Sequence, residues 1–100
     1  MIRGTTPTHK FNISFDTSLI KDIRISYAQD GAIITEKSLD DCALEGDVIT
    51  TSLTQEETLK FHEKRPVELQ IRLLTTLGTA MATRIYTLNA GKVLNKEVLA

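Results

Sequence analysis

Apolar and polar residues alternate along most of the chain. The clearest case is residues 67–73, where four apolar residues alternate strictly with three polar ones. Residues 11–15 and 23–27 have the same period of two. This period puts the apolar side chains on one face of a β-strand and the polar side chains on the other. The pattern therefore predicts strands that are buried on one face and wet on the other.

Turn-forming residues separate the alternating segments. Asp30-Gly31 lies between two of them and is typical of a tight hairpin, and Glu45-Gly46-Asp47 indicates a second hairpin. The β-branched residues of the segment 48–51 favour an extended backbone. We predict about seven short strands, at residues 9–16, 20–29, 32–38, 42–45, 48–53, 66–75 and 79–89.

A single short helix is predicted between the fifth and sixth strands, near residues 54–60. Thr54 and Glu57 have the spacing of a capping box, in which each side chain binds the other residue's backbone N–H. About two turns of helix are too short to persist alone in water, so we expect Leu59 or Phe61 to attach the helix to a sheet.

These elements predict an all-β fold, an immunoglobulin-like antiparallel β-sandwich. The chain has no tryptophan and one cysteine, which excludes the antibody-type group with its Cys–Trp–Cys core. We expect one domain over residues 1–100, with arms of little core pattern at 1–8 and 91–100. The apolar positions predicted to meet in one core are Ile13, Phe15, Ile23, Ile25, Tyr27, Leu69, Ile71 and Leu73.

Composition and charge narrow the class of protein. Hydrophobic residues make up 41% and charged residues 25%, as in ordinary globular domains. The formal net charge of −1 excludes a broadly basic nucleic-acid binder. No apolar run is long enough to span a membrane, and the first residues lack an apolar signal core, so we expect neither a membrane partner nor export.

The residues that carry chemistry in other proteins are sparse here. Cys42 is the only cysteine and lies among carboxylates, which disfavour a reactive thiolate. The five glycines form no phosphate-binding motif, and no serine lies in a nucleophile motif. Adjacent Glu56 and Glu57 point in different directions on a helix, and His62 has no second ligand at metal-binding spacing. We therefore expect no enzyme, no cofactor and no metal site.

A protein without a catalytic constellation acts through its surface. The polar face of the best-defined strand carries Glu68, Gln70 and Arg72, which we single out as a candidate interaction face. An ordinary solvated surface is the favoured reading of these three residues, and the terminal segments 1–8 and 91–100 are the first candidates for contact, because they can order on binding.

Two segments resemble a known group of proteins. They are Ser52-Leu53-Thr54-Gln55-Glu56-Glu57-Thr58-Leu59 and the strand Val67-Glu68-Leu69-Gln70-Ile71-Arg72, which a Thr-Leu-Gly turn follows. Together with the opening residues 1–9, they resemble small structural proteins of tailed phages and prophages of Gram-positive bacteria. They are also similar to the immunoglobulin-like N-terminal domain of upper-baseplate proteins, where a Leu-Ser/Thr-x-Glu-(Glu/Asp)-Thr helical cap precedes a strand.

The resemblance implies a virion structural or assembly protein that acts through protein–protein contacts. Its partners would be other virion proteins and copies of itself, and it would lie in the cytoplasm of the bacterial host during assembly and then in the virion. The alternative function is a carbohydrate- or receptor-binding β-sandwich module. Such a module needs exposed aromatic side chains, and the chain offers only two tyrosines and no tryptophan.

Overall fold

The computed structural model describes residues 1–100. It contains eight strands, one short α-helix and two single-turn 3-10 helices. In chain order the elements are β1 (Thr8–Asn12), η1 (Thr17–Leu19), β2 (Ile20–Gln29), β3 (Ala32–Ser38), η2 (Leu39–Asp41), β4 (Cys42–Glu45), β5 (Val48–Ser52), α1 (Gln55–Leu59), β6 (Pro66–Thr75), β7 (Ala80–Ala82) and β8 (Tyr86–Asn89).

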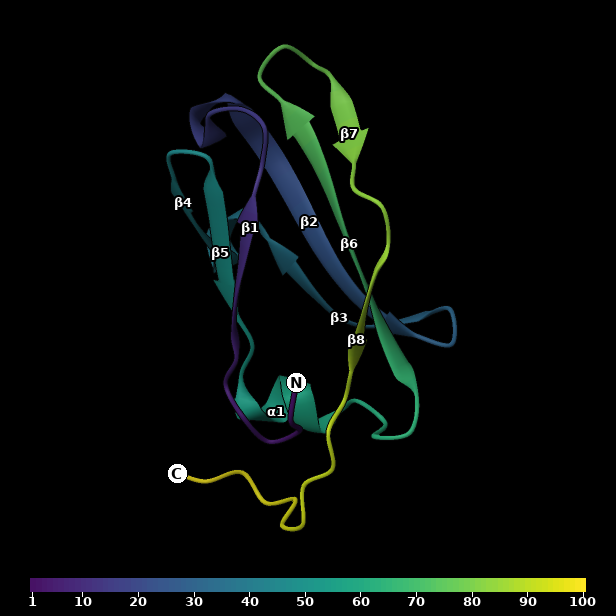
Figure 1. Ribbon diagram of the computed structural model, residues 1–100. Coiled ribbons are helices and arrows are strands. Elements are labelled where there is room, and N and C mark those ends of the chain that lie inside the picture. The colour runs from purple at the N-terminus through teal and green to yellow at the C-terminus, as the bar shows by residue number, and fades with distance from the viewer.

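The strands form two antiparallel sheets that pack as a sandwich (Figure 1). One sheet has the order β1-β5-β4. The other has the order β3-β2-β6-β7, and β8 pairs with β6 beyond the end of β7. This arrangement confirms the predicted all-β, antiparallel sandwich.

The connectivity is that of an immunoglobulin-like Greek key. If β1, β2 and β3 are taken as strands B, C and C′, then β4, β5 and β6 are D, E and F, and β7 with β8 is G. The sheets then have the orders B-E-D and C′-C-F-G. As predicted, α1 lies in the connection between the fifth and sixth strands, where the chain crosses from one sheet to the other.

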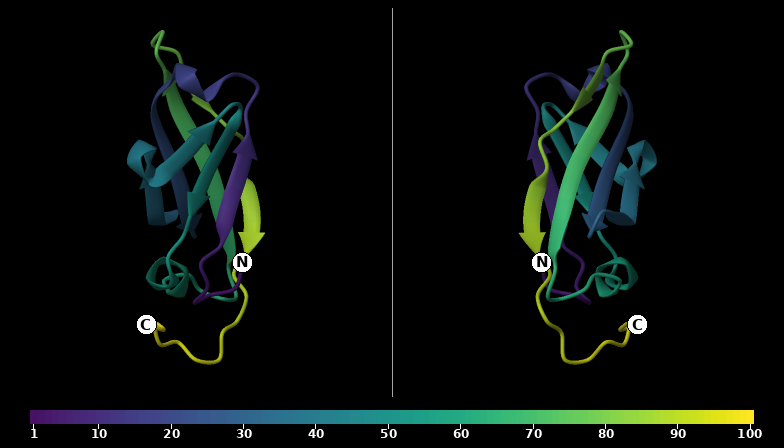
Figure 2. Two further views of the ribbon diagram at one scale, coloured as in Figure 1. Left: turned by 90° about the vertical axis from the view of Figure 1, so that its left-hand side faces the viewer. Right: turned by 90° about the vertical axis from the view of Figure 1, so that its right-hand side faces the viewer.

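The sandwich is elongated along its strands, with principal extents of 46 × 29 × 17 Å. The side views of Figure 2 place α1 and both chain termini at one end. The β6–β7 turn and η1 lie at the opposite end (Figure 1). The long faces of the two sheets are therefore free of covering helices.

Both predicted hairpins are present. Asp30 and Gly31 have φ angles of 52° and 80°, so both central residues of the β2–β3 turn adopt the positive φ of a type I′ turn. This turn suits the right-handed twist of the two strands that it joins. The β4–β5 turn likewise has Gly46 at a positive φ of 57°.

The core lies between the sheets and is built mainly from the alternating residues of β2 and β6. Six of the eight predicted core residues are buried, and they include Tyr27. The other two, Ile13 and Phe15, are half-buried and pack against the core from its edge. The full set of buried apolar residues is Ile20, Ile23, Ile25, Tyr27, Ile49, Leu53, Phe61, Val67, Leu69, Ile71, Leu73 and Ala90.

The helix forms as its sequence predicts. Thr54 Oγ1 accepts a hydrogen bond from the Glu57 N–H (3.1 Å), and Glu57 Oε1 accepts one from the Thr54 N–H (2.8 Å). Phe61, at 1% exposure, anchors the end of the helix in the core, and Thr58 is fully buried. The capping box and the apolar anchor are both confirmed.

Two strand boundaries differ from the prediction. The first strand ends at Asn12 rather than at residue 16, because its partner β5 begins at Val48 and Asp16 already caps η1. The predicted strand 79–89 is divided into β7 and β8. The pairing with β6 shifts by one residue between the two halves, so that a β-bulge separates them.

Candidate interaction face

The three residues singled out from the sequence lie together on the outer face of the five-stranded sheet. Glu68, Gln70 and Arg72 alternate along β6 with buried apolar residues. The neighbouring strand β2 places Ala28 opposite Glu68, Ser26 opposite Gln70 and Arg24 opposite Arg72. The period of two therefore brings these side chains to one surface, as predicted.

This surface is hollowed. A depression of about 620 Å³ lies over the three residues and extends from the β2–β3 hairpin to the loop that joins β7 and β8. Two isoleucines on its borders are largely exposed, Ile33 at 61% and Ile85 at 53%. We name the residues lining the depression the β6 face: Arg24, Ser26, Ala28, Gly31, Ile33, Glu36, Glu68, Leu69, Gln70, Arg72 and Ile85.

The bulge between β7 and β8 gives this face one of its borders. The Thr83 N–H donates to the Ile71 carbonyl (2.9 Å), while the Ile71 N–H donates to Thr83 Oγ1 (3.1 Å) in place of a backbone acceptor. The Thr83 carbonyl is thereby freed, and it accepts a hydrogen bond from Gln70 Nε2 (3.0 Å). Gln70 thus stabilises the bulge through this hydrogen bond. The extra residue of the bulge places Ile85 beside the depression.

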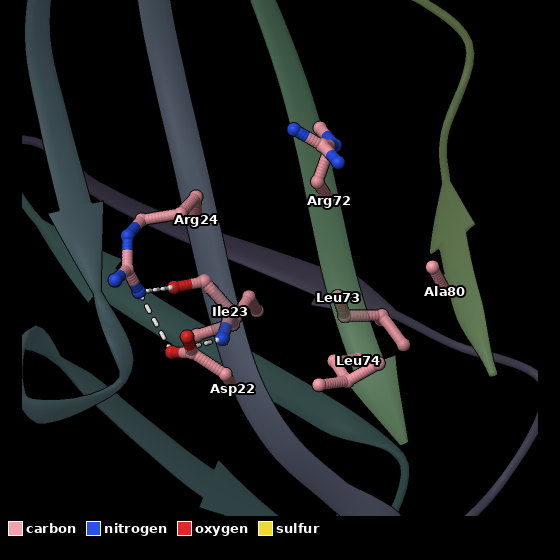
Figure 3. A pocket seen from close by; sticks show the side chains of 7 residues that line it. All are labelled: Asp22, Ile23, Arg24, Arg72, Leu73, Leu74 and Ala80. Carbon is pink, nitrogen blue, oxygen red and sulfur yellow. Dashed lines mark hydrogen bonds and ion pairs between the residues drawn. The ribbon is translucent and has the colours of Figure 1, made fainter. Parts of the chain in front are cut away.

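The charged residues of the face differ in their partners. Arg24 bends back along its own strand, where Nη1 donates to Asp22 Oδ1 and to the Ile23 carbonyl, both at 2.7 Å (Figure 3). Arg72 stands opposite on β6 beside a second hollow of about 290 Å³, with neither an ion pair nor a hydrogen bond to any residue of the chain (Figure 3). Its charge is therefore available to a partner.

The opposite charge lies further along the same strand. Glu68 is half-buried at the other end of the hollow and also has no ion-pair partner within the chain. Glu36 of β3 accepts a hydrogen bond from Ser26 (2.9 Å) at the border. The β6 face thus has a basic end at Arg72 and an acidic end at Glu68.

A polar cluster inside the sandwich was missed by the sequence analysis. Lys37 points inward from β3 with 8% exposure, and its Nζ lies 2.7 Å from Glu57 Oε1. Glu57 Oε2 accepts a further hydrogen bond from Thr35 (2.9 Å). Burial alone raises the pKa of Glu57, but the hydrogen bonds from Lys37, the Thr54 N–H and Thr35 outweigh it and lower this pKa to about 2.

A second inward pair lies beside this cluster. His9 Nδ1 and the Tyr27 hydroxyl are 2.6 Å apart, and Tyr27 is fully buried. Burial lowers the pKa of His9 and raises that of Tyr27, because it disfavours the charged form of each group. The pair lies between the sheets, where each residue is the hydrogen-bond partner of the other, and neither residue lines the hollows at the β6 face or near α1. These internal contacts therefore tie the sheets and α1 together.

A polar hollow of about 320 Å³ lies near α1, away from the β6 face. It gathers side chains of both charges, and Arg3 at its wall also lies 3.7 Å from Glu63. Its lining residues are Arg3, His62, Glu63, Lys64, Arg65 and Lys96. Because Glu63 and Arg65 are already engaged in ion pairs, this hollow offers less free charge than its composition indicates.

No three His, Cys, Asp or Glu side chains gather closely enough to hold a metal ion. No helix in the structure has the length and apolar character that crossing a membrane requires. Comparison with protein-family models, with curated proteins and with solved structures finds no match for the chain.

Proposed function

We propose that the chain is a structural or assembly protein of a phage or prophage virion, in the tail, baseplate or head, and that it acts through protein–protein contacts. The proposal that the particle is a phage virion is supported by the resemblance of residues 52–59 and 67–72 to phage structural proteins. Its partners are other virion proteins and copies of itself, first in the host cytoplasm and then in the assembled particle.

The observation that carries the contact function is the β6 face. It combines exposed Ile33 and Ile85 with the unpaired charges of Glu68 and Arg72 on one hollowed surface. Apolar borders supply association energy when they are covered, and unpaired charges select the partner and its orientation. On a sheet face that contacts only water, two largely exposed isoleucines beside the same depression would have no stabilising role.

A carbohydrate- or receptor-binding module is the second candidate. Sugar binding uses exposed aromatic rings, and Tyr27 is unavailable because it is buried against His9. Tyr86 is 37% exposed, and the Arg84 guanidinium lies 4.7 Å from its ring centre. The β6 face itself is lined by aliphatic and charged residues, which favours a protein partner.

The test is made on particles. Virions from an induced lysogen that carries this gene are purified on a density gradient, and the chain is quantified against the major capsid protein by mass spectrometry. We expect a fixed copy number in particles or assembly intermediates, with a host cytoplasmic protein of similar size as the contamination control. Arg72→Glu should reduce incorporation, whereas Lys10→Glu, an exposed reversal on β1 of the other sheet, should not.

The proposal fails on a clear outcome. If the chain is missing from particles and intermediates, and deletion of its gene leaves plaque formation normal, the protein has no structural role in the virion.

A further inference from the structure

We infer that the partner of the β6 face is a second copy of this chain, packed face to face across a two-fold axis. The inference rests on the proposed function, because it takes the same surface as a contact surface. It adds the identity of the partner, the symmetry and the residue pairs that meet.

The order of charges along β6 carries this inference. Glu68 and Arg72 are four residues apart on the same face, which separates them by about 13 Å, and Gln70 lies midway between them. A two-fold axis between the two faces, perpendicular to β6 and level with Gln70, reverses the strand direction of the second copy. Each Glu68 then lies over the Arg72 of the other copy, so that one symmetric contact forms two ion pairs.

The neutral residues of the face fit the same arrangement. Ile85 borders the hollow and comes just before Tyr86, which pairs with Leu69, so it lies near the level of Gln70 and the two copies bring their Ile85 side chains together close to the axis. Arg24 is already paired with Asp22 and lies over Ala28 of the other copy, where no second charge opposes it. The ion pairs therefore flank a contact that has an apolar part.

The mixture of charges also favours a copy over a partner of one sign. An acidic surface fits Arg72 but opposes Glu68 and Glu36, and a basic surface does the reverse. A surface with the same two charges in reversed order fits both ends, and a second copy supplies it by symmetry.

One contact opposes the pairing and provides a separate test. Glu36 lies opposite Ser26, which is level with Gln70, so the two-fold axis brings the Glu36 side chains of the two copies towards each other at the border. Like charges in this position weaken association. Glu36→Gln keeps the acceptor for the Ser26 hydroxyl and removes the repulsion, so this variant should associate more tightly than the natural chain.

The area of the face sets the expected strength. β2 and β6 have ten residues each and are thus about 33 Å long, and four strands at the usual spacing are about 19 Å wide. The face therefore offers roughly 600 Å² per copy, below the roughly 800 Å² of a standard interface. We expect a weak dimer in solution that becomes occupied where many copies are held together in a particle.

The experiment is sedimentation velocity of the purified full chain over a concentration series that extends to about 1 mM, at low and high salt. Glu68→Arg and Arg72→Glu should each weaken dimerisation about tenfold or more, because each replaces two attractions by two repulsions. The double variant Glu68→Arg/Arg72→Glu restores complementarity in reverse and should recover dimerisation. Lys10→Glu on β1 is the matched control, and circular dichroism checks that every variant is folded.

Two results overturn the inference: a natural chain that remains monomeric through the whole series, and a double variant no better than the singles. If either occurs while Arg72→Glu still reduces incorporation into particles, the proposed function stands and the β6 face binds another virion protein. If the charge pattern governs dimerisation but the chain is missing from particles, the self-pairing stands and the virion function fails.

Discussion

Glu57 shows how much one side chain contributes to this fold. One of its carboxylate oxygens closes the capping box of α1 and binds buried Lys37, and the other accepts from Thr35. The short helix is thereby attached to β3 through a charged contact as well as through Phe61. A helix of five residues has little stability of its own, so this contact fixes where the connection between the sheets lies.

Protonation of Glu57 should therefore weaken the fold. Its pKa is about 2 in the folded chain against 4.5 ordinarily, so the folded state prefers the ionised form. The stability from this group is complete above about pH 4.5 and is lost as the pH falls through about 2. In urea titrations at a series of pH values, Glu57→Gln should flatten the decline in unfolding free energy across this window.

Glu56→Gln is the control, since Glu56 is an exposed neighbour on the same helix that makes no hydrogen bond through its side chain. It should follow the pH dependence of the natural chain. Equal pH dependence of all three proteins would show that Glu57 does not hold α1 to β3.

At the scale of elements, the bulge between β7 and β8 depends on one hydroxyl. Thr83 Oγ1 accepts from the buried Ile71 N–H, which has no backbone acceptor at that position. Thr83→Val keeps the shape of the side chain and leaves this N–H without a partner, so it should cost about 1–3 kcal/mol of unfolding free energy. Thr83→Ser retains the acceptor and should lose less.

Amide hydrogen exchange separates this effect from a general loss of packing. In Thr83→Val the Ile71 amide should exchange faster than its neighbours on β6, and in Thr83→Ser it should remain protected. Uniform acceleration along the whole of β6 in both variants would contradict the assigned role of the hydroxyl.

The elements also show which features a sequence pattern reveals. The strict alternation of residues 67–73 predicted both the inward residues of β6 and the common outward face of Glu68, Gln70 and Arg72. Asp30-Gly31 predicted its hairpin because the type I′ turn demands residues that tolerate positive φ. Both signals depend only on residues that are close together in the sequence, so the sequence alone is enough to detect them.

Features that depend on distant partners were not predictable in this way. The inward position of Lys37 contradicts its polarity and makes sense only with Glu57 beside it. The bulge at Thr83 interrupts an otherwise continuous β-like segment, and its cause lies on β6. The depression of the β6 face likewise requires the register of β2 and β3, which no pattern within β6 specifies.

At the scale of the whole molecule, the two terminal segments are attached differently. Met1 packs against the core, and Ile2 pairs in parallel with Gly91. Arg3 Nη2 donates to the Leu59 carbonyl at 2.9 Å. The last residues, in contrast, reach the domain mainly through exposed hydrogen bonds between Gln55 and the backbone of Leu99.

Truncation should expose this difference. Deleting residues 94–100 removes exposed contacts worth about 0.5 kcal/mol or less, so the melting temperature should change by less than about 4 °C. Deleting residues 1–3 removes the packing of Met1 on the core and the partly buried hydrogen bond of Arg3, together worth about 2 kcal/mol or more, and should lower it by more than about 8 °C. Thermal melts followed by circular dichroism decide the matter, and equal effects of the two deletions would refute the difference in attachment.

The break between β7 and β8 affects how copies of the chain can assemble with one another. An unbroken strand at this edge would present a long row of free backbone groups, on which further copies add strand by strand into an open ribbon. The bulge leaves segments of only three and four residues, out of register with each other. Fibre growth at this edge is therefore disfavoured, and a face-to-face contact about a two-fold axis closes after two copies.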